Sequence, residues 1–191
     1  MLTKIIVALA LLSFARAQTP EGFVPSVSSQ LDVLFGTKAV SPPGMSLTKA
    51  ETAKQPIIGT NETLTGTYLF MMIDLDVPAS FTNPSSGPRR TNLHAMVQDF
   101  KPDGQTSAAG VQTLASTAKT PVAYIGPAPP AETPPHPHRY VTLLFEQPEG
   151  FAVPESQKSQ IRQKIGFNVT TFIEAAALKA PVAGNYFTVS G

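Results

Sequence analysis

Thr67-Tyr68-Leu69-Phe70-Met71-Met72-Ile73-Asp74-Leu75-Asp76-Val77-Pro78 is the stretch of sequence that decides the fold. Residues 67–73 are β-branched, aromatic and apolar without helical spacing, which predicts a strand buried on both faces. Nineteen prolines in 191 residues oppose an all-helical chain and favour strands joined by stiff turns. The other predicted strands are 93–97 and 140–145, with shorter ones at 31–35, 123–125 and 186–189. The chain is therefore predicted to be mostly β.

A helix is predicted near the end of the chain, where Val169, Phe172, Ile173 and Ala176 recur on one helical face. Asn168 is placed to cap its first turn, and the preceding Phe167 is placed to pack on Phe172.

Two further segments have weaker patterns. Residues 154–165 are polar with few apolar positions, which predicts a second helix on the surface. Residues 101–120 are rich in Ser, Thr, Ala, Gly and Gln, and we interpret them as a long variable loop.

The first residues indicate the compartment. A cationic start at Lys4, an apolar run over 5–12 and Ala15-Arg16-Ala17 predict a signal peptide at 1–17, leaving a single domain at 18–191. The apolar run is much shorter than the ~20 residues that span a bilayer, so we expect no transmembrane anchor. The protein is expected to be secreted, with an extracellular or a vacuolar destination. A secreted chain without cysteine has no disulfides and depends on its core.

The charge balance bears on partners. The chain has 14 basic and 13 acidic residues, and removal of Lys4 and Arg16 leaves 12 against 13. Nucleic acid is therefore not an expected partner, because binding a phosphate backbone needs a clustered basic face.

Two sequons suit secretion, at Asn61 and Asn168. Asn61 lies in a polar stretch between apolar runs and is the favoured glycosylation site. Asn168 opens the predicted C-terminal helix, where its side chain is also placed to act as a cap.

Three groups of polar residues lie at the ends of predicted strands. Asp74 and Asp76 follow the buried strand, and in an extended segment their side chains point to the same side. They either crowd as two carboxylates or accept backbone N–H bonds in the turn before Pro78. His94 lies in an apolar strand and His138-Arg139-Tyr140 opens another; each alone is weak evidence for a site.

These residues, taken in order, resemble the phosphatidylethanolamine-binding protein family. The resemblance rests on Asp74-Leu75-Asp76-Val77-Pro78 with Asn83-Pro84, Gly87-Pro88-Arg89-Arg90 and Leu93-His94; on Tyr124-Ile125-Gly126-Pro127 with Pro137-His138-Arg139-Tyr140; and on Phe167 to Phe172 with 180–187. Leu75 stands where the family commonly has proline, and the chain has no tryptophan before the strand histidine.

The resemblance implies an antiparallel β-sandwich core with flanking helices and a small pocket. Carried over by position, Asp74, His94, His138 and Tyr140 would form that pocket, with Asp76 close by. The family's pocket accepts anions such as phosphate, acetate or a phospholipid headgroup. Imidazole N–H groups and a tyrosine hydroxyl are suitable donors to such oxygens.

The leading hypothesis is therefore a secreted binding protein that turns nothing over and needs no cofactor or metal. The first alternative is an inhibitor of a serine carboxypeptidase, because family members inhibit such enzymes. The second is a hydrolase in which His138 or His94 acts as a base beside Asp74, or these three residues bind zinc or iron. The sequence has no G-x-S-x-G, no cysteine and no H-E-x-x-H.

Overall fold

The computed structural model describes residues 17–107 and 110–191. The strands are β1 (Asp32–Phe35), β2 (Lys38–Ala39), β3 (Met45–Leu47), β4 (Ile57–Thr60), β5 (Tyr68–Val77), β6 (Arg90–Thr106), β7 (Gln112–Ala115), β8 (Pro121–Val122), β9 (His138–Glu146) and β10 (Ala183–Val189). The helices are the 3-10 turn η1 (Glu155–Gln157), α1 (Lys158–Gln163) and α2 (Val169–Ala175).

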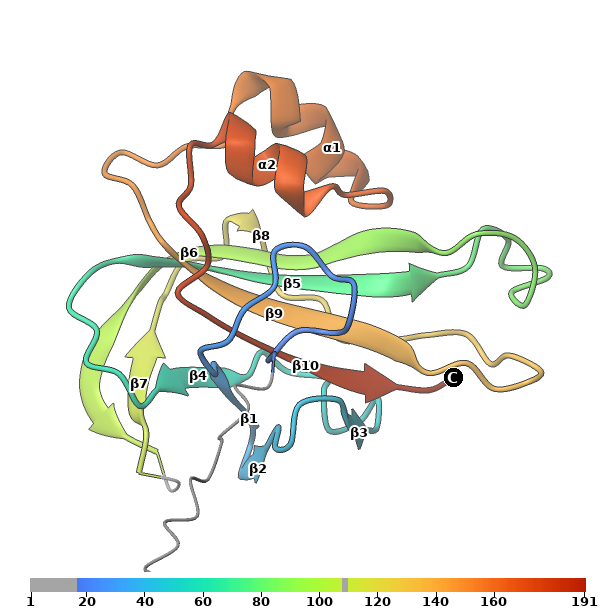
Figure 1. Cartoon of the computed structure of the whole chain (residues 1–191), viewed down its shortest axis with the longest axis horizontal. Coiled ribbons are helices and arrows are strands. Elements are labelled where there is room, and N and C mark those ends of the chain that lie inside the picture. Colours follow the sequence, from blue (N-terminus) through green and yellow to red (C-terminus); the bar gives the residue numbers. More distant parts are fainter. Residues whose placement is uncertain (1–16, 108–109) are drawn as a thin grey trace, which may run out of the picture.

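All ten strands belong to one curled sheet, which folds into two layers (Figure 1). Its order is β2-β1-β4-β7-β6-β5-β9-β10-β3, with β8 paired to β6. The long strand β6 is shared: its first part pairs with β5 and β8, and its last part pairs with β7. Every pair is antiparallel except β10 with β3, which is parallel. The expected sandwich-like β core with flanking helices is confirmed.

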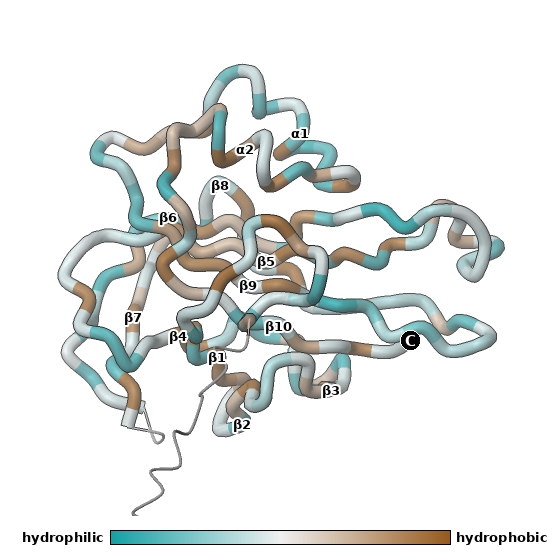
Figure 2. The backbone as a smooth tube through the Cα atoms, viewed as in Figure 1, coloured by the Kyte–Doolittle hydropathy of each residue, from teal (hydrophilic) through white to brown (hydrophobic). Residues whose placement is uncertain are grey.

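Strand β5 carries the core on both of its faces, as its apolar run predicts. Leu69, Met71 and Ile73 pack on the helix side, with Phe167 and Phe172. The alternate residues of β5 pack between the two layers of the sheet. Figure 2 shows apolar colour along the central strands and hydrophilic colour over much of the outer loops.

The main strands were predicted correctly and prove longer than the apolar runs that indicated them. The prediction of a strand at 123–125 is wrong, because β8 is confined to residues 121–122. The long loop predicted for 101–120 is also wrong, because β6 continues to Thr106 and β7 follows at 112–115. Most side chains at the end of β6 are exposed, so backbone pairing holds this hairpin without any apolar pattern.

Both helices were predicted, and the C-terminal one has the expected start. The Asn168 side chain accepts a hydrogen bond from the Thr171 N–H at 3.1 Å. The Phe167 and Phe172 rings pack with their centroids 5.6 Å apart. Between them, these contacts fix the first turn of α2 on the outer face of the sheet.

Replacing Asn168 with alanine is expected to lower the free energy of unfolding by about 1 kcal/mol, because the Thr171 N–H loses its acceptor. Urea unfolding of unglycosylated protein measures this value. Asn61→Ala is the control, since the exposed Asn61 lies in the connection between β4 and β5. A cost at Asn61 as large as that at Asn168 would contradict the capping role.

The described residues include no helix long and apolar enough to cross a membrane. The predicted signal peptide lies almost wholly outside the described residues, and its cleavage before Gln18 stays a prediction. Gln18 itself is bound to the fold, because its N–H donates to the Val27 carbonyl at 2.7 Å.

Candidate functional site

Four of the five predicted site residues line one cavity of about 180 Å³. It lies at one end of the layer that contains β5, β6 and β9. Asp74 comes from β5, His94 from β6, and His138 and Tyr140 from β9. Figure 1 shows this end at the right, where the β5–β6 loop and the loop entering β9 project from the sheet. The cavity opens at the surface, because exposed side chains also line it.

Sheet geometry explains why side chains so far apart in sequence meet. Asp74 lies opposite Tyr140 in the β5–β9 ladder, and the period of two places His138 on the same face as Tyr140. His94 is placed by a bulge, because Met72 pairs with Ala95 while Ile73 pairs with Leu93. The extra residue, His94, is thereby turned out of the regular alternation and into the cavity.

The Tyr140 ring is fixed by aromatic neighbours on three sides. It stacks on Phe187 of β10 with centroids 5.4 Å apart, and on His138 at 6.4 Å. The His94 ring meets it edge-on at 5.2 Å. The phenol therefore has little freedom to reorient, and its hydroxyl is held in the cavity.

His138 is held between two carboxylates. Its Nδ1 donates to Asp74 Oδ2 at 2.8 Å, and its Nε2 lies 3.3 Å from Glu132 Oε1. Burial alone would lower the pKa of His138, but the hydrogen bond and charge of Asp74, together with Glu132, raise it. The two carboxylates therefore favour the protonated form of His138, and both of its ring nitrogens have protein partners.

His94 has the opposite electrostatic character. Its Nδ1–H donates to the Ile125 carbonyl at 2.9 Å, and its Nε2 lies 4.0 Å from Asp74 Oδ2. Burial lowers the pKa of His94, and the bond to Ile125 and the charge of Asp74 offset this only in part. In the neutral ring, Nε2 is then the unprotonated nitrogen.

The Tyr140 hydroxyl is buried and makes no hydrogen bond of good geometry with the described residues. Burial raises the pKa of Tyr140 above its ordinary value, and the charge of Asp74 adds to this effect. The hydroxyl therefore stays protonated and is a hydrogen-bond donor at the cavity.

Asp76, the fifth predicted residue, does not line the cavity. Its carboxylate accepts three bonds of 2.8 Å from Arg139, one from the backbone N–H and two from the guanidinium, and His136 Nε2 lies 3.5 Å away. Burial would raise the pKa of Asp76, but the bonds from Arg139 lower it. Asp74 accepts the Asp76 N–H at 2.8 Å, so both aspartates accept backbone bonds and each has its own cation.

Sequence reasoning missed Glu132, which lies in the Pro-rich loop before β9. Its carboxylate is clamped by Arg89, with bonds of 2.8 and 2.6 Å from the two terminal nitrogens. The same guanidinium donates to the Asp76 carbonyl at 3.1 Å, and Ser85 donates to the Thr133 carbonyl. The two loops that border the cavity are thus joined. The only signal for Glu132 was that it is the one acid in a long neutral stretch.

In Glu132→Gln, the free energy of unfolding is expected to fall less steeply as the pH is lowered than it does in the parent protein. The bonds from Arg89 lower the pKa of Glu132 from 4.5 to about 2. The folded state therefore binds fewer protons than the unfolded state, so this stabilisation is present above pH 4.5 and is lost as the pH falls towards 2. Urea unfolding at several pH values measures the slope. Glu149→Gln, at an exposed turn, is the control, and an unchanged slope in Glu132→Gln would contradict the clamp.

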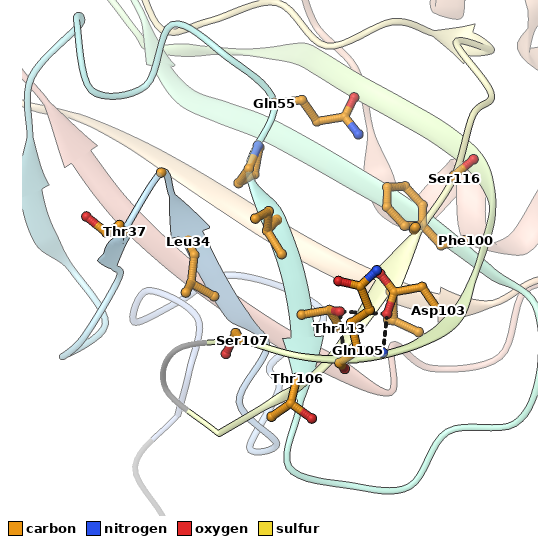
Figure 3. A pocket seen from close by; sticks show the side chains of 15 residues that line it. Leu34, Thr37, Gln55, Phe100, Asp103, Gln105, Thr106, Ser107, Thr113 and Ser116 are labelled. Atoms are coloured by element: carbon orange, nitrogen blue, oxygen red, sulfur yellow. Dashed lines mark hydrogen bonds between the residues drawn. The ribbon is translucent and has the colours of Figure 1, made fainter.

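A larger cavity of about 310 Å³ lies in the other layer, beside the β6–β7 hairpin (Figure 3). None of the predicted site residues lines it. The carboxylate that lines this larger cavity belongs to Asp103, which is exposed and already accepts hydrogen bonds from the Thr113 hydroxyl and the Gln105 N–H. Across residues 17–107 and 110–191, no group of His, Asp and Glu is arranged to hold a metal ion. We therefore place the candidate site in the smaller cavity.

Comparison with known proteins identifies the family. The phosphatidylethanolamine-binding protein family model matches residues 15–187, which is nearly the whole chain. The chain belongs to the phosphatidylethanolamine-binding protein family. This confirms the resemblance carried by the three ordered motifs.

Relatives of this family member come from different settings. "Phomoidride biosynthesis cluster protein N" of Talaromyces stipitatus is 31% identical over 97% of this chain and 96% of that protein. A "26 kDa secreted antigen" of Toxocara canis is 28% identical over 87% of this chain, which spans 60% of the antigen. Among solved structures, the carboxypeptidase Y inhibitor, crystallised with its cognate proteinase, matches 86% of this chain and 84% of its own. Its TM-score is 0.60 at 20% identity, a likeness that concerns the fold.

Proposed function

We propose that this family member is a secreted binding protein whose cavity accepts an anionic group, such as phosphate or a phospholipid headgroup, without turning it over. The observation that carries the proposal is the buried Tyr140 hydroxyl, which interacts with the Asp74 carboxylate but makes no hydrogen bond of good geometry with the described residues. Leaving a buried donor unpaired costs free energy, and such groups occur where a ligand supplies the acceptor.

The charges around the cavity favour an anion that binds together with a proton. Three carboxylates (Asp74, Asp76 and Glu132) are matched by His138, Arg139 and Arg89. With His94 neutral, these three acidic and three basic groups balance in charge. An anion that accepts the Tyr140 hydroxyl and a proton carried on His94 Nε2 keeps this balance. Asp74 is positioned to meet the amine of a zwitterionic headgroup.

The proposal is tested by calorimetric titration of the secreted protein with sulfate, inorganic phosphate and phosphoethanolamine. Tyr140→Phe keeps the aromatic stack and removes only the donor, so we expect anion affinity to fall about 10- to 100-fold. Tyr124→Phe is the matched control, because that hydroxyl donates to the Thr52 carbonyl and does not line the cavity. Equal affinity in Tyr140→Phe and the parent would refute the assignment.

A second candidate function is favoured by the relative from a biosynthesis cluster. In that case the ligand is a small organic acid made by such a cluster, and its carboxylate takes the place of phosphate in the same cavity. Aliphatic carboxylates added to the titration series test this, and conversion of any of them by the protein would overturn binding without turnover. Inhibition of a serine carboxypeptidase stays a prediction, measured by peptidase activity with and without the protein.

A further inference from the structure

The larger cavity, beside the β6–β7 hairpin, is separate from the candidate site. Its volume of about 310 Å³ lies within the range of roughly 300–1,000 Å³ that is typical of small-molecule sites. It shares no lining residue with the smaller cavity. The chemistry of its walls therefore indicates what it binds independently of the first site.

The floor of the larger cavity is apolar, although it lies on the outer face of its layer. Leu34 of β1 and Ile57 of β4 are partners in the β1–β4 ladder, so their side chains lie on the same face of the sheet. The next residue, Ile58, points the other way and is fully buried in the core. Leu34 is 5% exposed but belongs to neither apolar core of the described chain, and Ile57 is 50% exposed. An apolar surface is thus open to a ligand here.

A polar wall borders this floor. The β6–β7 ladder shifts register between Pro102 and Thr106, so that three residues of β6 lie opposite one residue of β7. Within this bulge, Asp103 Oδ1 accepts the Thr113 hydroxyl at 2.7 Å and the Gln105 N–H at 2.9 Å. Figure 3 shows these three residues joined together, across the cavity from Leu34. The hydrogen bonds therefore hold the wall in place beside the floor.

The wall gives the larger cavity a negative charge. Asp103 is the only ionisable residue among the described residues that line it. The bonds from Thr113 and Gln105 lower the pKa of Asp103, so the carboxylate is charged at neutral pH. Both bonds go to Oδ1, and no donor in the described part of the chain bonds to Oδ2. Oδ2 is therefore available to a cation, whereas an anion would meet a like charge.

We propose that the larger cavity binds a small amphipathic amine, with its apolar body on Leu34 and Ile57 and its ammonium group at Asp103 Oδ2. This goes beyond the proposed function, because it concerns another site and a ligand of opposite charge. Burial of the apolar body supplies most of the affinity. The ion pair with an exposed carboxylate adds roughly two- to fivefold, and it determines which of several similar ligands is preferred.

The test is an NMR titration of the secreted protein with hexylamine, hexanol and hexanoate, which share one apolar body and differ in charge. The backbone amides of Ile57 and Thr113 report on the larger cavity, and that of His94 reports on the smaller one, so binding at the two sites is measured separately. At the larger cavity we expect hexylamine to bind roughly two- to fivefold more tightly than hexanol. Hexanoate is expected to bind there most weakly, because it meets the charge of Asp103.

Two pairs of variants separate the apolar contribution from the charged one. Ile57→Ser is expected to weaken the binding of hexylamine and hexanol alike, by about tenfold. Val24→Ser removes an exposed apolar group outside the cavity and is expected to bind as the parent does. Asp103→Asn keeps an oxygen for the two existing hydrogen bonds and is expected to abolish the preference for hexylamine over hexanol. Asp99→Asn, on the same strand but outside the cavity, is expected to keep that preference.

Two results in the parent would overturn the proposal: equal affinity for hexylamine and hexanol, or hexylamine shifts that leave Ile57 and Thr113 unchanged. A preference for hexylamine that survives in Asp103→Asn would overturn it as well. If Ile57→Ser fails to fold, Ala115→Phe fills the cavity from an exposed position and is expected to weaken both probes in the same way. Binding of hexylamine by Ala115→Phe at the parent's level would place the amine elsewhere.

Discussion

Replacing Asp74 with alanine is expected to lower the free energy of unfolding by about 3–5 kcal/mol. Asp74 is 2% exposed, and it accepts both the His138 Nδ1–H and the Asp76 N–H. Its removal leaves the buried His138 ring without one of its two carboxylate partners and the Asp76 N–H without an acceptor. For a chain of this length the loss corresponds to a fall of about 6–20 °C in Tm, measured by calorimetry.

Two further variants separate charge from backbone support. Asp74→Asn keeps an oxygen for the Asp76 N–H but loses the charge opposite His138, so its cost is expected to be smaller than that of alanine. Asp103→Ala also removes a carboxylate with two hydrogen bonds, but an exposed one, and is expected to cost about 1 kcal/mol or less. If the Asp74 and Asp103 alanine variants unfold at the same temperature, the buried Asp74–His138 pair contributes no more to stability than the exposed Asp103 carboxylate does.

Sulfate affinity is expected to fall about tenfold for each pH unit above 6.5. His94 is neutral in the free protein, because burial holds its pKa below 6.5. A bound anion stabilises the protonated ring, so binding takes up one proton and weakens as the pH rises. Sulfate is the appropriate probe because it does not titrate in this range. Calorimetric titration between pH 6.5 and about 8 measures the slope.

The His94→Gln variant tests whether His94 is the group that takes up the proton. His94→Gln places an amide donor near the cavity without any need for protonation, so its sulfate affinity is expected to lose the pH slope. His136→Gln removes a histidine that does not line the cavity, and it is expected to retain the slope. A slope that persists in His94→Gln would assign the proton to another group, and the anion could not be bound through His94.

Much of the fold was predictable because its central strands are apolar on both faces. The runs at 67–73, 93–97 and 140–145 became β5, β6 and β9, which carry the core and the site. The β6–β7 hairpin was not predictable. Its exposed end is held by backbone pairing and by polar side-chain bonds, such as those that Asp103 accepts from Thr113 and the Gln105 N–H, and these leave no hydrophobic period in the sequence. The short edge strands β2 and β3 left no pattern either.

The convergence of four of the five predicted residues on one cavity was predictable, but the electrostatics of that cavity were not. Motif order indicated Asp74, His94, His138 and Tyr140, and all four line one cavity. The contact of Glu132 with His138 depends on the path of the loop between β8 and β9, which spacing does not reveal. The bulge that turns His94 into the cavity arises from pairing with β5, which no local pattern records.

The parallel pairing of β3 with β10 joins the beginning of the fold to its end. Among the strands that the structure describes, β3 pairs in register with β10 alone, at residues 187–189. As the chain emerges from a ribosome or a translocation channel, β1 can pair with β2 and β4 early, whereas β3 has no strand partner until β10, about 140 positions later in the chain, has been made. Shortening the chain by a few residues at its C-terminus would expose an open edge on β9 and leave β3 without a neighbour, a combination that invites aggregation.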